Sequence, residues 1–173
     1  MIPPPLVHDP SLTPPASLAV PHPQPFAMRL VPTAEGVSRS VPHVNNVEYV
    51  RWLDRAAELH SDSLGWTRDA LLASGRMWFV ARHEVEYRAE VFPGDELMVF
   101  TWVRNSGRSS SWRDTVIARV RDGAVVCRGS TCWAYVDLAT RRPARIPPDM
   151  ALAFQPLEAA ACTLRSSSIP SGS

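Results

Sequence analysis

The apolar positions that follow residue 45 recur at the spacing of an amphipathic helix. Residues Val47, Val50, Leu53, Ala57 and Leu64 roughly keep the 3.6-residue period of one buried helical face. Asn45 or Asn46 would cap the start of this helix, and Glu48 would lie near the positive end of its dipole. A second, shorter helix is predicted to begin at a Thr67 cap and to stop at Gly75.

From residue 76 the period changes to two. Apolar Val85, Tyr87, Ala89 and Val91 alternate with charged Glu84, Glu86, Arg88 and Glu90, which is the pattern of a half-buried strand. The sequences PGD at 93–95 and DG at 122–123 are turn signals. With a first strand from Phe26 to about Val37, the order becomes strand, helices, then a meander of four long antiparallel strands. The predicted class is α+β, an antiparallel sheet wrapped around a long central helix.

The prolines divide the chain into three parts. Residues 1–25 hold nine of the 17 prolines, which disfavour both helix and central strand, so we expect an irregular N-terminal arm. This arm is expected to lie over the surface of the domain or of a partner subunit. Residues 26–155 carry the ordered pattern of one domain, and residues 156–173 are expected to form a flexible C-terminal tail.

Composition excludes several classes of protein. In a chain of 173 residues, 45% hydrophobic content and six Trp are enough for one buried core. The formal charge of +1 argues against a dedicated nucleic-acid binder, and no run of about 18 apolar residues predicts a membrane span. The N-terminus does not have the pattern of a secretory signal, and the odd number of cysteines (Cys127, Cys132, Cys162) favours reduced thiols. We therefore expect a cytoplasmic protein.

The residues best suited to catalysis or binding lie at the predicted start of the long helix. His43 can donate, accept or take a proton near neutral pH, and the amides of Asn45 and Asn46 can hold a water or an oxyanion. The unpaired backbone amides of a helix start can also polarise a carbonyl. The simpler interpretation is that the Asn residues only cap the helix and that His43 is a hydrogen-bonded loop residue.

Three motifs resemble the hotdog-fold acyl thioesterases, in particular the 4-hydroxybenzoyl-CoA thioesterase-like group and the plant fatty acyl-ACP thioesterases. They are HVNNVEYVRWLDRA at 43–56, VEYRAEVFPGDELMV at 85–99 and CRGSTCWAYVDLATRRPARIP at 127–147. The resemblance covers roughly residues 26–155. It implies a hotdog fold, sites built across a homodimer interface, and hydrolysis of acyl-CoA or acyl-ACP without a metal or organic cofactor. A homodimer or a dimer of dimers is therefore expected.

Transferred by position, the resemblance assigns His43 and Glu90 to catalysis, and Asn46 is expected to help polarise the thioester carbonyl at the helix start. Asn45, Tyr49 and Arg39 are expected to bind the substrate. The sequence departs from the family at Arg39. Those relatives have an Asp at the position of Arg39, and the plant enzymes have an Asn where this chain has Val41. Arginine cannot act as a general base, although it can bind a carboxylate or phosphate of the substrate.

Glu90 is the best remaining carboxylate, with His43 as a second candidate base. The alternative for Glu90 is a solvated pair with Arg88 on the polar face of the alternating strand. Cys127 and Cys132 are expected to fill the core, and His60 is expected to place a favourable charge at the C-terminal end of the long helix. Five tryptophans are expected in the core, at a dimer interface or along an acyl tunnel: Trp52, Trp78, Trp102, Trp112 and Trp133.

Three functions remain open at this stage. The first is hydrolysis of an acyl-CoA or acyl-ACP thioester. The second is a non-catalytic hotdog module that binds an acyl thioester or another small ligand. The third is a hotdog dehydratase or hydratase, whose own sequence signatures are not evident here.

Overall fold

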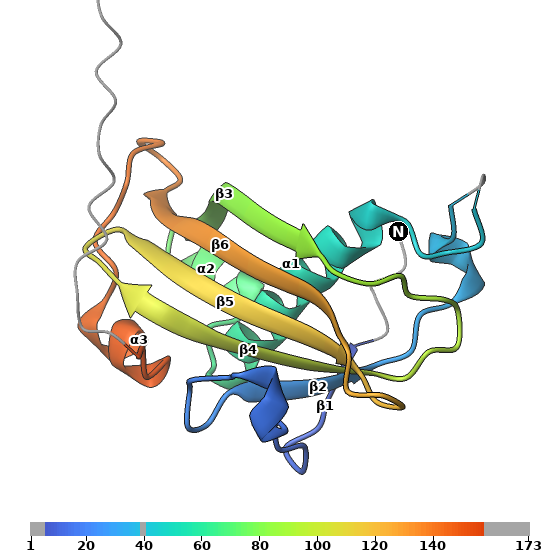
Figure 1. Cartoon of the computed structure of the whole chain (residues 1–173). Helices are drawn as coiled ribbons and strands as arrows, with labels where there is room; N and C mark the ends of the chain where they lie inside the picture. The colour runs from blue at the N-terminus through green and yellow to red at the C-terminus, as the bar shows by residue number, and fades with distance from the viewer. Residues whose placement is uncertain (1–5, 39–40, 158–173) are drawn as a thin grey trace, which may run out of the picture.

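A single six-stranded antiparallel sheet forms the framework of the protein (Figure 1). The computed structural model describes residues 6–38 and 41–157. The strands are β1 (Leu6–His8), β2 (Phe26–Leu30), β3 (Arg76–Tyr87), β4 (Leu97–Ser106), β5 (Ser110–Arg119) and β6 (Val125–Asp137), in the spatial order β1-β2-β4-β5-β6-β3. The helices are α1 (Asn46–Ser63), α2 (Arg68–Ala73) and α3 (Pro148–Ala153), with 3₁₀ turns at Ala16–Leu18 and Ala34–Gly36. The predicted α+β class is confirmed.

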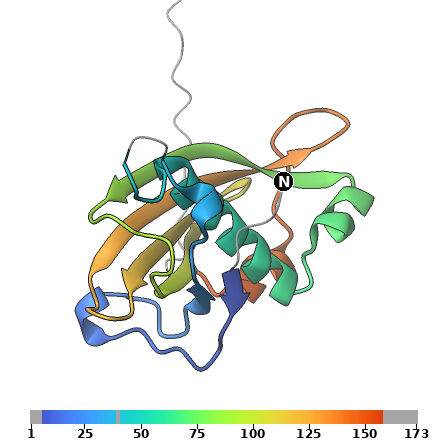
Figure 2. The same ribbon diagram turned by 90° about the vertical axis from the view of Figure 1, so that its right-hand side faces the viewer.

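The curved sheet wraps one face around α1, as the side view in Figure 2 shows. Five side chains of α1 are buried against it: Tyr49, Trp52, Leu53, Ala56 and Ala57. The helix approaches β6 so closely that a Cβ atom on Gly129 would lie 2.6 Å from a methyl carbon of Leu53. The absence of a side chain at Gly129 therefore permits the contact between helix and sheet.

The predicted meander of four strands is wrong for one of them. Strands β4, β5 and β6 are consecutive neighbours, but β3 pairs with β6 and forms the edge of the sheet. The chain leaves this edge after Tyr87, where the amides of Arg88 and Ala89 both approach the carbonyl oxygen of Val126. Residues 88–96 then cross to the other side of the sheet, where β4 pairs with β2.

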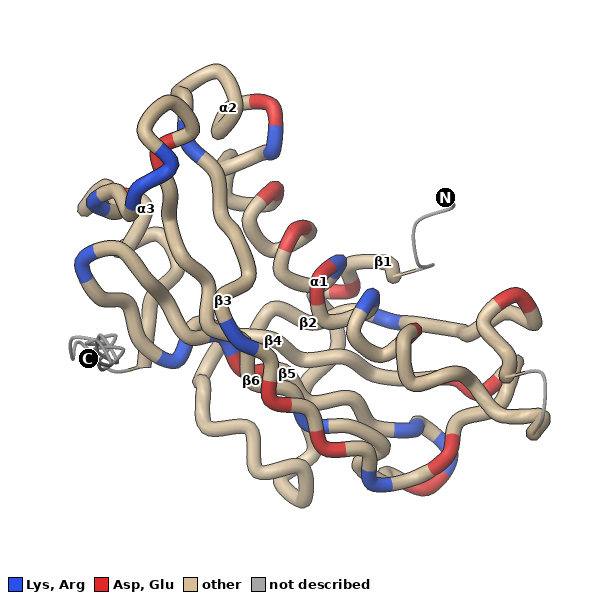
Figure 3. The backbone as a smooth tube through the Cα atoms, turned by 90° about the horizontal axis from the view of Figure 1, so that it is seen from above, with Lys and Arg blue, Asp and Glu red and all other residues tan. Residues whose placement is uncertain are grey.

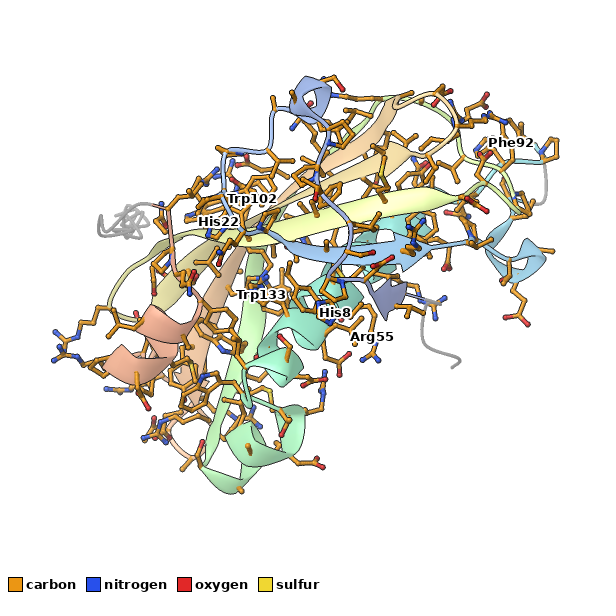
Figure 4. All side chains as sticks on the ribbon, turned by 90° about the horizontal axis from the view of Figure 1, so that it is seen from below. His8, His22, Arg55, Phe92, Trp102 and Trp133 are labelled. Atoms are coloured by element: carbon orange, nitrogen blue, oxygen red, sulfur yellow. The ribbon has the colours of Figure 1, made fainter. Side chains whose placement is uncertain are left out.

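The N-terminal arm covers the outer face of the sheet. Leu18 is fully buried there in a cluster with Phe100, Trp102 and Val116, and Arg128 donates a 2.8 Å hydrogen bond to the Leu18 carbonyl. Figure 4 shows Trp102 beneath the arm, on the side of the sheet away from α1. The arm is less irregular than we expected, because it contributes β1, which pairs antiparallel with β2. The predicted limits of arm, domain and tail stay a prediction.

Candidate active site

One backbone hydrogen bond brings His43 and Glu90 together. The Val44 amide donates to the Val91 carbonyl at 2.8 Å, so the loop before α1 runs beside the segment that follows β3. The residues that precede these two, His43 and Glu90, become neighbours as a result. Their side chains approach to 3.4 Å between Nδ1 of His43 and Oε1 of Glu90.

The pair lies at a boundary between core and solvent. The His43 side chain is 27% exposed and the Glu90 side chain 64% exposed. A separation of 3.4 Å is longer than a well-formed hydrogen bond, so the buried Nδ1 atom has no hydrogen-bond partner among the described residues. Catalytic hydrogen bonds are often this long in a protein without substrate and shorten when it binds.

Glu90 does not lie on a strand, which corrects the predicted extent of the alternating segment. β3 ends at Tyr87, and the chain turns away before Glu90. The guanidinium of Arg119 holds the Glu90 carbonyl by a 3.0 Å hydrogen bond. The predicted solvated pair with Arg88 does not form, because Arg88 instead binds Glu86, 2.7 Å away. The Glu90 carboxylate therefore faces His43 rather than Arg88.

The two asparagines have different positions at the start of α1. Asn45 is the cap, since its side-chain oxygen accepts the Val47 amide at 3.0 Å. Asn46 is the first helical residue, its side chain is exposed, and its own backbone amide has no acceptor within the described residues. An open N–H group at a helix start, three residues beyond His43, can donate to a developing oxyanion.

Two tyrosines, Tyr49 and Tyr87, pack beside the His43–Glu90 pair and the start of α1. The Tyr49 side chain is 3% exposed, and its hydroxyl faces the Ala89 carbonyl at 3.5 Å, next to Glu90. Burial raises the pKa of Tyr49 to about 12, so the hydroxyl keeps its proton. Tyr87 donates to the Asn46 carbonyl at 3.4 Å and contacts the Tyr49 ring edge to face. Tyr49 therefore packs beside the site, next to Glu90. The sequence did not indicate that Tyr87 or Arg119 contacts the site.

One predicted site residue cannot be placed, and two kinds of feature are not found among the described residues. Arg39, which stands where the related enzymes have an Asp, lies outside the described residues. Within residues 6–38 and 41–157 no three His, Cys, Asp or Glu side chains gather as a metal site would require. No helix in the same ranges is both long and apolar enough to cross a bilayer.

A long helix wrapped by an antiparallel sheet is the architecture of a hotdog-fold protein. The chain belongs to the thioesterase-like superfamily, whose family model matches residues 41–154. The matched range includes His43, Glu90 and the whole of α1.

Individual relatives agree with this assignment. The chain is 30% identical over 97 residues to the chloroplastic acyl-[acyl-carrier-protein] hydrolase FATB3 of Cuphea viscosissima, a match that covers 53% of this chain and 24% of that protein. It thus spans about a quarter of the length of such curated relatives. Among solved structures, a 1,4-dihydroxy-2-naphthoyl-CoA thioesterase from Synechocystis superposes with a TM-score of 0.70 at 15% identity, over 75% of this chain and 95% of that one. A 12:0-ACP thioesterase from Umbellularia californica gives 0.65 at 20% identity, over 75% and 53%.

Proposed function

We propose that the chain hydrolyses an acyl thioester, with CoA or an acyl carrier protein as the thiol, to a free acid and that thiol. The observation that carries this proposal is the His43–Glu90 pair beside the open amide of Asn46, in a chain of the thioesterase-like superfamily. A base, a polarised carbonyl and access to water are what such a hydrolysis needs. The names of the plant relatives support the same substrate class.

In the proposed mechanism, Glu90 takes a proton from water, whose oxygen attacks the thioester carbonyl carbon. The backbone amide of Asn46 donates to the carbonyl oxygen as its negative charge grows. The carbon–sulfur bond then breaks, and the proton returns to the departing thiolate. His43 orients the Glu90 carboxylate through Nδ1 and supplies a second proton-transfer group. Asn45 holds the helix start, and Arg39 binds a phosphate or carboxylate group of the substrate.

We further propose that the active form is a homodimer or a dimer of dimers, located in the cytoplasm. The support for association is strand β3, an edge strand that exposes apolar Phe79 and Val80 at 43% and 40%. An edge of this kind offers unpaired backbone groups and apolar surface to a second copy. The support for the location is that Cys127 is buried as a free thiol, the state that a reducing compartment maintains.

Release of free thiol from a panel of acyl-CoAs and acyl carrier proteins tests the proposal directly. Steady turnover of at least one thioester by the purified chain is the expected result. Binding of a thioester without turnover would instead assign a non-catalytic acyl-binding module. Reversible hydration of an enoyl thioester, followed by loss of the enoyl absorbance, would assign the dehydratase or hydratase alternative.

A further inference from the structure

A pocket lies at the opposite end of α1 from His43 and Glu90. It has a volume of about 100 Å³, room for several water-sized groups, and is lined by the second half of α1, the two short helices and the near ends of β3 to β6. Its first residue on α1 is Asp54, roughly 12 Å along the helix axis from Asn46. Nothing in the proposed hydrolysis uses this pocket.

The walls are mainly apolar, but one lining residue is a buried cation. Arg113 on β5 is 5% exposed, and burial lowers the pKa of its guanidinium to about 10, which leaves it charged at neutral pH. No Asp or Glu among the described residues forms an ion pair with it. The adjacent Asp114 is directed to the other face of the sheet, where it binds Arg104 at 3.2 Å.

The hydrogen-bond and ring partners of Arg113 among the described residues are neutral groups. Its guanidinium donates to Nδ1 of His60 at 2.8 Å and approaches the Thr101 hydroxyl at 3.4 Å, and it lies 5.4 Å from the centre of the Phe154 ring. Because Nδ1 of His60 accepts, this imidazole is uncharged. Burial, with the nearby Arg113, lowers the pKa of His60 to about 2, so the imidazole stays neutral at any working pH.

A second donor in the pocket lacks an acceptor. Trp133 on β6 lines the pocket, and its buried Nε1–H has no hydrogen-bond partner within the described residues. The register pairs Trp133 with Ser111 and Arg113 with Thr131, so both donors belong to the sheet face that α1 covers, as Figure 4 shows for Trp133. A buried cation without a counter-charge is costly, and an anionic group in the pocket would offset that cost. The unpaired N–H of Trp133 is a further donor in the lining of the same pocket.

Acidic residues on α1 line the helix side of the pocket, and Figure 3 marks their positions along the helix. Asp54, Glu58 and Asp62 follow one another at i, i+4 and i+8, and Glu58 is neutralised by Arg55 and Arg68. None of the three forms an ion pair with Arg113. The three carboxylates therefore line the pocket without pairing with Arg113, and its guanidinium can meet a negatively charged group of a ligand.

We propose that this pocket binds a small aliphatic or aromatic carboxylate, with its carboxylate on Arg113 and its apolar body against the tryptophan-rich walls. The same chemistry can come from a free acid or from a carboxyl group at the far end of an acyl thioester. The proposal concerns binding and does not depend on the proposed hydrolysis.

Calorimetry on the unmodified protein tests the proposal with three ligands of equal length: hexanoate, hexan-1-ol and hexylamine. Hexanoate is expected to bind roughly ten- to a hundredfold more tightly than hexan-1-ol, because only the carboxylate can form a charge-assisted hydrogen bond with the Arg113 guanidinium. Equal binding of acid and alcohol, or tighter binding of the amine, would overturn the proposal. This comparison needs no variant, so it holds even if substitutions at Arg113 prevent folding.

Variants then locate the carboxylate. Arg113→Met is expected to remove the preference for hexanoate over hexan-1-ol, whereas Arg68→Gln at the exposed rim keeps it. Binding of hexanoate to Glu90→Gln is expected to equal that of the unmodified protein, whatever the fate of hydrolysis. If Arg113→Met is folded by circular dichroism and still prefers hexanoate, the assignment to Arg113 fails.

Calorimetric binding of adipyl-CoA and of hexanoyl-CoA to Glu90→Gln, with Arg113 present and with Arg113→Met added, separates the two sources of the carboxylate. An Arg113-dependent preference for adipyl-CoA would identify the end of the acyl chain as the ligand. Binding of hexanoate without such a preference would identify a free acid. Either result supports the pocket, and absence of both contradicts it.

Discussion

Glu90 and His43 lie together because the Val44 amide donates to the Val91 carbonyl. Side-chain substitutions leave this backbone hydrogen bond in place, so they can test the roles of the two residues separately. Glu90→Gln keeps the shape of the side chain and removes the base, so kcat for thioester hydrolysis should fall by roughly 10²–10⁴-fold with KM little changed. His43→Ala should also lower kcat, by a smaller factor, because Glu90 would keep its base but lose its orienting partner. Steady-state assays of thiol release measure kcat and KM for both variants.

The matched control for Glu90 is Glu86, whose side chain is equally exposed, at 64%, and is paired with Arg88 instead of a histidine. Glu86→Gln should therefore leave kcat and KM unchanged. Wild-type rates in both Glu90→Gln and His43→Ala would refute the site assignment even in a protein that hydrolyses thioesters.

Sequence reasoning at the residue scale works best where a motif fixes a position and poorly where packing decides the charge. His43 and Glu90 were both named from the sequence, and the structure brings them together. His60 was expected to carry a positive charge at the end of the helix, which is wrong, because it stacks on Phe26 and accepts from Arg113 in the interior. No periodicity of β5 indicates that Arg113 is directed inward, so the carboxylate pocket was missed.

At the scale of elements, α1 begins with a capping asparagine, Asn45, followed by an exposed one, Asn46. Asn45→Ala removes the cap on the Val47 amide and should lower the free energy of unfolding by about 1 kcal/mol, within a range of roughly 0.5–2. Asn45→Asp, which keeps a capping oxygen, should retain most of the stability of the unmodified protein. Denaturant unfolding followed by circular dichroism provides the measurement.

Asn46→Ala is the partner experiment, because the Asn46 side chain is exposed and has no capping bond. It should change stability by less than about 0.5 kcal/mol. A fall in the rate of thiol release without loss of stability would then indicate that the Asn46 side chain contacts the substrate. A loss of stability as large as that of Asn45→Ala would contradict the division between the two residues.

The contact of α1 with β6 depends on Gly129, so a single methyl group there should be costly. Gly129→Ala places a carbon 2.6 Å from the buried Leu53 side chain and should lower the free energy of unfolding by about 1–3 kcal/mol. Combining it with Leu53→Ala should cost at least about 0.5 kcal/mol less than the sum of the single changes, because the smaller side chain makes room. Simple additivity would show that the helix does not press on this glycine.

The elements themselves were predictable where local signals agree. Asn45, Thr67 and Gly75 bound α1 and α2 close to the places that the sequence indicates, since caps and a positive φ act over one turn. The position of β3 at the far edge, beyond β6, was not predictable, because pairing across a sheet is a long-range choice that alternation does not encode.

At the scale of the whole molecule, the sheet has two covers: α1 on one face and the N-terminal arm on the other. The sequence indicated the arm through its prolines, and a proline-rich segment can pack without regular structure because its backbone needs few hydrogen bonds. What the sequence could not indicate is that Leu18 anchors the arm at full burial against Phe100 and Trp102.

Leu18→Ala tests whether the arm is part of the cooperative core. The substitution leaves a cavity over the outer face of the sheet and should lower the free energy of unfolding by about 2–4 kcal/mol. Val7→Ala, in the arm's short strand, is the control: Val7 is 65% exposed, so its truncation should cost less than about 0.5 kcal/mol. Denaturant melts followed by tryptophan fluorescence, to which Trp102 beneath the arm contributes, report both. If the two variants lose equal stability, the arm is an appendage of the fold and not its second cover.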